Sequence, residues 1–175
     1  MVVVPDVLDA IKDYEHMDVL AAGGIATGRQ MAACMAMGAA GAWCGSVWLT
    51  TSEAETTPTV KEKMLKAGAR NTVRSRSRTG KPTRQLQSAW TDAWYAEGAP
   101  DPLPMPLQGI ISRPPMDKID RLAASGHDGA KQLATYYVGQ AVGLMNQEQS
   151  ARSVVYDFME DYAAAVERLS RTLED

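Results

Sequence analysis

The first fifty residues show two spacings of hydrophobic positions, one helical and one continuous. Apolar residues in the range 7–11 share one face of a helix. A short apolar run from Val19 to Ala22 follows, and a second run covers residues 39–44. Each run ends in glycine, which permits a tight turn out of a strand. The pattern predicts a crossover helix followed by two buried strands.

A helix is predicted between these two strands, from Gly28 to Met37. Thr27 can cap its start and Gly38 can end it. Strand, helix and strand in this order form a βαβ unit, whose strands run parallel. Such units bind ligands at the carboxyl ends of their strands, where glycines let amide groups approach an anion. The sequence therefore predicts a site for the phosphate of a nucleotide or flavin.

Residues beyond 50 have a mainly helical pattern, interrupted by a proline-rich stretch. Six prolines between residues 100 and 115 predict an irregular surface loop over residues 101–113. Leu86, Trp90 and Trp94 repeat at four-residue spacing, which predicts one face of a helix. Further helices are expected at residues 58–68, 116–125 and from Ser150 onward, whereas residues 131–146 fit neither helix nor strand.

A basic stretch runs from Arg70 to Arg84. Arginines 74, 76 and 78 alternate in it with small polar residues, as in an extended segment. The stretch could bind an anion or nucleic acid, or it could be a solvated edge whose arginines pair with the protein's own carboxylates. We favour the solvated edge, because no aromatic residues that could stack on bases are interleaved here.

Composition and charge exclude several classes of protein. The 175 residues are 45% hydrophobic and 22% charged, which fits one ordinary domain. A net charge of −3 offers nucleic acid no general attraction. Cys34 and Cys44 lack the spacing of a metal pair, so buried reduced thiols are expected. No apolar run reaches the roughly 18 residues that cross a bilayer, so we expect a cytoplasmic protein without a membrane partner.

Short sequence words carry a resemblance to a known family. Residues 20–28 read Leu-Ala-Ala-Gly-Gly-Ile-Ala-Thr-Gly, and residues 43–46 read Trp-Cys-Gly-Ser. They resemble the last two strand ends of FMN-dependent (β/α)8 barrels, in particular the nitronate monooxygenases, formerly called 2-nitropropane dioxygenases. The words Thr-Gly-Lys-Pro-Thr-Arg at 79–84 and Gly-Gln-Ala-Val-Gly at 139–143 extend the resemblance over almost the whole chain.

The resemblance implies a set of cofactor-binding residues. In such barrels, main-chain amides after the seventh and eighth strands hold the phosphate of FMN. A dianion needs several convergent donors, and glycines keep side chains out of their way. The alternative is that these glycines only make tight turns. The positions that inherit the phosphate-binding role are Gly23, Gly24, Trp43, Cys44, Gly45 and Ser46, with Gln140 on the flavin side of the pocket.

The resemblance also says which catalytic group the chain does not contain. The family's base is a histidine in a Gly-Gly-His word, which is expected upstream of Met1. His16 and His127 are the chain's two histidines, and both are expected in solvent-facing turns. No catalytic or metal-binding residue is therefore assigned within the chain. The implied reaction removes a proton alpha to a nitro or nitronate group, and reduced flavin and oxygen then give a carbonyl compound and nitrite.

We therefore expect an α/β fold, the C-terminal part of a TIM (β/α)8 barrel with a C-terminal helical extension. Residues 1–70 are expected to hold the βα units and residues 71–175 the extension, packed together as a single domain. The predicted function is FMN-dependent oxidation of a small-molecule nitronate. Two alternatives stay open: a flavin-dependent enoyl or NAD(P)H reductase, and a truncated non-catalytic chain that binds a phosphate ligand. Exposed sheet edges would also favour a homo-oligomer.

Overall fold

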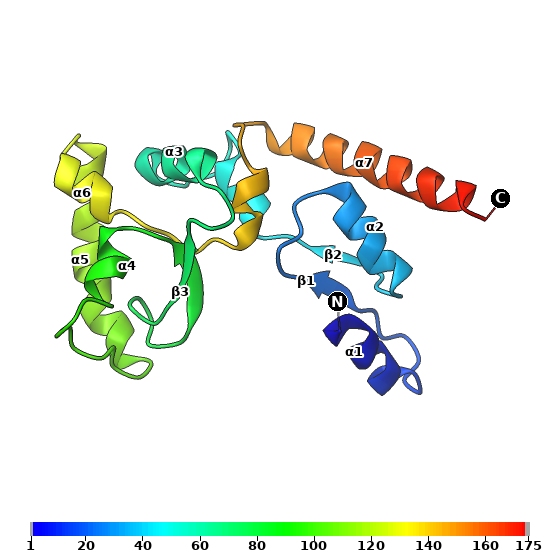
Figure 1. Ribbon diagram of the computed structural model, residues 1–175, viewed down its shortest axis with the longest axis horizontal. Helices are drawn as coiled ribbons and strands as arrows, with labels where there is room; N and C mark the ends of the chain where they lie inside the picture. The colour runs from blue at the N-terminus through cyan, green and yellow to red at the C-terminus, as the bar shows by residue number, and fades with distance from the viewer. Residues whose placement is uncertain (1, 174–175) are drawn as a thin grey trace. The chain divides into compact units, whose positions relative to one another are not determined.

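The computed structural model describes residues 2–173 and groups them into two compact units (Figure 1). The first unit contains the residues up to Glu53 together with the segment that begins at Glu148. The second unit comprises Ala54–Gln147. The final helix thus groups with the first fifty residues, whereas residues 54–70 group with the chain that follows them.

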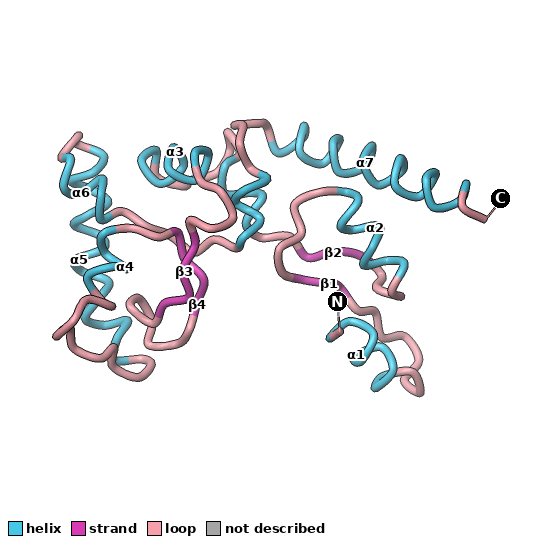
Figure 2. Tube along the Cα trace, viewed as in Figure 1, coloured by secondary structure: helices cyan, strands magenta, loops and turns pink. Residues whose placement is uncertain are grey.

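The first unit contains the predicted βαβ arrangement (Figures 1 and 2). Strands β1 and β2 pair in parallel, with Ala21 opposite Ala42, so the prediction of two parallel strands joined by a helix is confirmed. In chain order the elements are α1 (Val3–Ile11), β1 (Leu20–Ala22), α2 (Gly28–Ala36), β2 (Gly41–Trp43), the 3₁₀ helix η1 (Ser46–Thr50) and α7 (Ala151–Arg171).

Helix α2 begins and ends where its sequence predicts. The hydroxyl of Thr27 accepts from the amide of Gln30, and the Gln30 side chain accepts in return from the amide of Thr27, which forms a capping box. At the other end, Gly38 has φ of +101°, a left-handed conformation that a glycine adopts without strain. Both helix boundaries are therefore fixed by local interactions.

Helix α7 packs along α2 at a close approach that Gly28 allows. A Cβ atom at position 28 would overlap the carbonyl oxygen of Phe158 and the amide nitrogen of Tyr162. Ser150 caps the start of α7 by accepting from the amide of Ser153, as predicted. The amphipathic last helix is therefore held against the βαβ unit by main-chain proximity as well as by side chains.

One face of the two-stranded sheet is covered and the other is open. Ala21 is buried with Ile25 and Ala39 beneath the helices. Leu20 and Trp43 lie on the opposite face and remain 48% and 68% exposed. A parallel sheet is ordinarily covered on both faces. Within the described residues this sheet has cover on one face only.

The second unit is built around an antiparallel hairpin with helices beside it. Gln85 in the hairpin also forms a bridge with Tyr137, which gives the pair a third extended segment. The elements are α3 (Pro58–Lys66), β3 (Thr72–Ser75), β4 (Thr83–Leu86), α4 (Ala89–Ala93), α5 (Leu107–Ala124), α6 (Asp128–Leu133) and the 3₁₀ helix η2 (Gln140–Leu144).

Two expectations for this unit are wrong. Leu86 ends strand β4 opposite Thr72 and does not share a helix with the two tryptophans. Its amide donates to the carbonyl of Tyr136, a distant partner that its sequence spacing cannot reveal.

The proline-rich stretch is not wholly a loop, because α5 starts at Leu107 and contains Pro114 and Pro115. These prolines carry no N–H for the helix ladder. Buried side chains hold α5 in place: Gln108 donates to the carbonyl of Ser77, and Ser112 donates to the carbonyl of Arg78.

The basic stretch uses its arginines within the unit. Arg76 donates to the carbonyl of Gly80, and Arg84 donates to the hydroxyl of Thr72. Arg78 donates to the carbonyl of Thr135 at 2.7 Å and lies over the rings of two neighbouring tyrosines. These bonds go to main-chain and hydroxyl oxygens, where we had expected carboxylates. The arginines therefore hold the hairpin in shape.

The close approach of α2 and α7 gives a direct test. Gly28→Ala should lower the free energy of unfolding by about 2–3 kcal/mol, because the added methyl group meets main-chain atoms that cannot rotate away. Gly109→Ala is the matched control in a helix, since its nearest atom would be 4.0 Å away. That control should be neutral or slightly stabilising. Chemical denaturation followed by circular dichroism measures both, and an unchanged Gly28→Ala midpoint would contradict the packing described.

Candidate functional site

Two glycine turns leave the sheet at the same edge. Ala22 and Trp43 are the last residues of the two strands and lie opposite each other in the parallel pair. The turn at Gly23 and Gly24 therefore starts beside the turn at Cys44 and Gly45. Carboxyl ends of parallel strands are where barrels of this kind of topology place their ligands.

The main chain of both turns is open. Gly23 and Gly24 have φ of +105° and +74°, values that L side chains rarely adopt. Gly45 has an ordinary φ of −112°. No atom lies within 4 Å of the position that a Cβ would take at any of these three glycines. A ligand can therefore approach the backbone where a larger residue would place its side chain.

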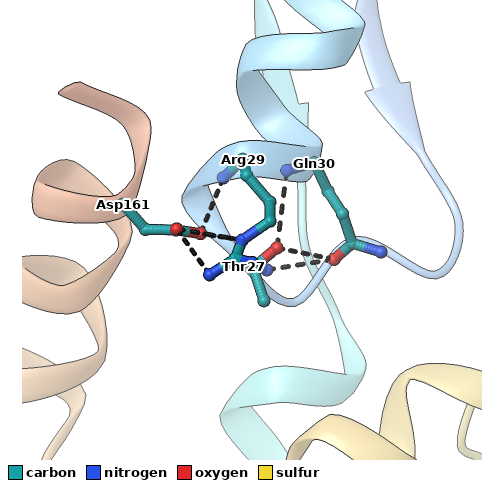
Figure 3. Close-up of polar contacts among 4 residues, drawn as sticks. All are labelled: Thr27, Arg29, Gln30 and Asp161. Carbon is teal, nitrogen blue, oxygen red and sulfur yellow. Dashed lines mark hydrogen bonds and ion pairs between the residues drawn. The ribbon is translucent and has the colours of Figure 1, made fainter. Parts of the chain in front are cut away.

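The start of α2, in contrast, is already occupied by protein groups (Figure 3). The side-chain oxygen of Gln30 accepts from the amides of Ala26 and Thr27, at 2.8 and 3.1 Å. The amide of Arg29 donates to the carboxylate of Asp161 at 2.8 Å. An anion at this edge must therefore use the amides of the glycine turns, since those of the helix start are taken.

Gln30 also braces the first turn. Its amide nitrogen donates to the carbonyl of Gly24 at 3.0 Å, while its oxygen caps the helix. One side chain thus fixes the carbonyl of Gly24 relative to the helix axis. The capping-box spacing of Thr27 and Gln30 is visible in the sequence, yet sequence reasoning did not assign Gln30 to the site.

Arg29 and Asp161 connect α2 to α7 beside the turn (Figure 3). The Nε and Nη2 atoms of Arg29 lie 3.0 and 2.9 Å from Oδ1 of Asp161. Hydrogen bonds from Arg29 hold the pKa of Asp161 below its usual range. Nothing in the sequence signals this pair, because its members are 132 positions apart.

The second turn combines exposed and partly buried groups. Trp43 is exposed, and the indole nitrogen of Trp48 donates to the carbonyl of Cys44 at 2.7 Å. Burial raises the pKa of the Cys44 thiol, and the neighbouring Cys34 raises it further. The thiol therefore stays protonated at neutral pH and adds no negative charge beside the turn.

An apolar cavity of about 410 Å³ adjoins this second turn. Side chains from α2, β2, η1 and α7 line it, among them Met31, Trp43, Trp48, Val155, Phe158 and Met159. It accounts for the partial exposure of the apolar face of α7.

Gln140 and the histidines lie elsewhere in the chain. Gln140 starts η2 in the second unit, where Gly143 allows close contact with Ala69, and its role toward a flavin stays a prediction. His16 is exposed and precedes β1, at the opposite end of the strand from the glycine turn. His127 is exposed and caps α6 by accepting from the amide of Ala130. Both histidines are therefore in exposed turns, as expected.

Two further expectations concern metals and membranes. Among residues 2–173, no group of three histidine, cysteine or acidic side chains is arranged to hold a metal ion. Within the same residues, none of the helices combines the length and apolar character needed to span a bilayer.

The fold and the site point to one class of protein. Among solved structures, a nitroalkane oxidase from Streptomyces ansochromogenes superposes on this chain with a TM-score of 0.74 at 27% identity. The match covers 95% of this chain and 45% of that enzyme. The chain is an α/β protein that corresponds to the C-terminal part of a TIM (β/α)8 barrel with a helical C-terminus.

Sequence comparisons identify the family. The nitronate monooxygenase family model matches residues 1–161, so the chain belongs to that family of oxidoreductases. The family is flavin-dependent in general. Rv1533 of Mycobacterium tuberculosis, which is named as a monooxygenase, is 54% identical over 169 residues, and nitronate monooxygenase npaC of Metarhizium robertsii is 32% identical over 182 residues. The matches cover 97% and 93% of this chain but 44% and 46% of the relatives. The chain thus spans about half the length of the curated relatives it matches.

The ion pair of Arg29 and Asp161 predicts a pH dependence. Because the pKa of Asp161 is lowered by folding, its stabilisation is complete above the unfolded value near 4 and is lost as the pH falls through the folded value. Wild type should exceed Asp161→Asn by about 1 kcal/mol at pH 7 and by nearly nothing at the acid end. Urea unfolding at several pH values measures this difference.

Asp9→Asn is the control, since it removes the same charge from an exposed position of α1. Its difference from wild type should stay small at every pH. A difference for Asp161→Asn that persists unchanged into acid would contradict the role of the carboxylate charge.

Proposed function

We propose that this chain holds the phosphate of FMN between its two glycine turns. The observation that supports this most directly is the open main chain of Gly23, Gly24 and Gly45 at one edge of a parallel strand pair. Family membership supports a flavin as the ligand. The proposed donors are the amides of Gly23, Gly24, Cys44, Gly45 and Ser46 with the adjoining main chain of Trp43, and the Ser46 hydroxyl can add one more bond.

The local chemistry fits a phosphate dianion. No carboxylate lies in either turn, and the Cys44 thiol is neutral at physiological pH. Glycine amides supply partial positive charge without a side chain that must be desolvated or ordered. The amides of the α2 start are occupied by Gln30 and Asp161, so they orient the turn without competing for the ligand.

We further propose that the family reaction on a nitronate or nitroalkane is the function of the protein in which this site works. Bound FMN supplies the redox chemistry, and the protein supplies position and electrostatics. The share of this chain is to bind the phosphate group and fix its orientation through Gln30. The proposed proton acceptor is the histidine of the Gly-Gly-His word, expected upstream of Met1, because His16 and His127 are both exposed and away from the turns of their own units.

Phosphate recognition predicts discrimination between two flavins. FMN should bind at least tenfold more tightly than riboflavin, which has the same ring system without the phosphate. Gly45→Leu should remove this preference, because the new side chain fills the open space beside the turn and the φ of −112° tolerates it. Fluorescence quenching on titration measures both affinities.

Circular dichroism of Gly45→Leu is the control for folding. Equal affinity of the wild-type chain for the two flavins would contradict a phosphate site. Absence of binding to either flavin would instead favour a non-catalytic chain with another ligand.

The choice of electron donor separates the nitronate reading from the reductase reading. Under anaerobic conditions, a nitronate should bleach the flavin absorbance of the loaded protein faster than NADH or NADPH does. A neutral nitroalkane should react more slowly than its nitronate, because it must first lose a proton and this chain contributes no base. Stopped-flow absorbance measures these rates. Rapid bleaching by a nicotinamide and none by a nitronate would favour the enoyl or NAD(P)H reductase.

A further inference from the structure

The first unit carries an uncovered surface that the phosphate site does not use. Strands β1 and β2 form a sheet of two strands, so each strand has one edge without a neighbouring strand in the described chain. The exposed residues Leu20 and Trp43 lie on the open face of this sheet. Main-chain donors and acceptors on such an edge, next to apolar side chains, form a template for another strand.

The edge of β2 has a groove beside it. Met31 from α2 and Phe158 from α7 form its floor, while Val155 and Met159 stand at its rim with about half of their surface exposed. The cavity holds about 410 Å³, and apolar atoms form most of its wall. A strand paired with β2 would place every second side chain toward this groove, since side chains alternate along a strand.

We propose that the surface formed by the β1 and β2 edges, Leu20, Trp43 and the α7 groove binds a separate polypeptide that carries the remaining strands of the barrel. The occupant pairs one parallel strand with the free edge of β2 and another with the free edge of β1. Its apolar side chains cover Trp43, Met159 and their neighbours. The barrel is thereby completed from two chains.

The size of the missing part identifies this occupant. A (β/α)8 barrel has eight strands, and the described chain supplies two parallel ones, which leaves six to come from elsewhere. Relatives that match this chain over most of its length are about twice as long. A second copy would bring only two more parallel strands, which is too few to close a barrel. The partner is therefore a complementary chain with six βα units.

Binding in trans can be tested with a relative. The part of the Mycobacterium tuberculosis relative that this chain does not cover is co-expressed as a separate polypeptide, and the tag is placed on this chain. We expect the two to co-purify and to sediment as a one-to-one complex. A tight dimer of this chain alone that ignores the other polypeptide would overturn the proposal in favour of self-association. Two chains that fold and sediment separately would overturn it as well.

A matched pair of variants locates the surface. Met159→Lys places a charge at the rim of the groove and should weaken the complex at least tenfold. Tyr156→Lys places the same charge on the same helix at a residue that is 61% exposed and does not line the groove. It should leave the affinity unchanged. Equal effects of the two variants would contradict the groove as the binding surface.

A covalent chimera covers the case in which the separate half precipitates. The uncovered part of the relative is fused ahead of this chain, and thermal unfolding is compared with and without Met159→Lys. The substitution should lower the Tm of the chimera while leaving the Tm of the isolated chain unchanged. No shift in the chimera would overturn the proposal. None of these readouts involves flavin, so a failure here is distinguishable from a failure of the phosphate site.

Discussion

The parallel pairing of two short strands is the constraint from which the site and the uncovered surface both follow. Because β1 and β2 run in the same direction, their carboxyl ends meet at one edge, and two glycine turns leave it side by side. The same pairing cannot cover itself. A parallel sheet is stable when both faces are packed, and here only the Ala21 face has a helical layer. Completeness of the ligand turns and incompleteness of the sheet have one origin.

The helix start between the strands shows how binding amides are kept available. Four residues bind one another at this point: Thr27, Arg29, Gln30 and Asp161. Their hydrogen bonds satisfy the amides that a helix start leaves unpaired. The glycine turn before them keeps its amides for a ligand while its carbonyl at Gly24 is fixed by Gln30. The last helix of the chain takes part through Asp161, so the geometry of the turn depends on residues far away in sequence.

Much of the first unit could be predicted because its signals are local. Glycine, threonine and apolar runs of strand length fix β1, α2 and β2 within a few residues of each other. The errors in the second unit arose where distant partners decide the structure. Leu86 extends a hairpin because Thr72 and Tyr136 pair with it, and α5 continues through Pro114 because Gln108 and Ser112 hold it. Asp161 escaped notice for the same reason.

The two proposals are linked thermodynamically. A flavin phosphate held by both turns would fix the ends of β1 and β2 relative to each other, and a partner strand on each free edge would fix the same strands. If both proposals hold, ordering that one ligand has already supplied need not be supplied again by the other. The affinity for FMN would then rise when the complementary chain is bound, and by reciprocity the affinity for that chain would rise by the same factor when FMN is present. Cofactor binding would thereby favour assembly of the barrel in which the base and the flavin meet.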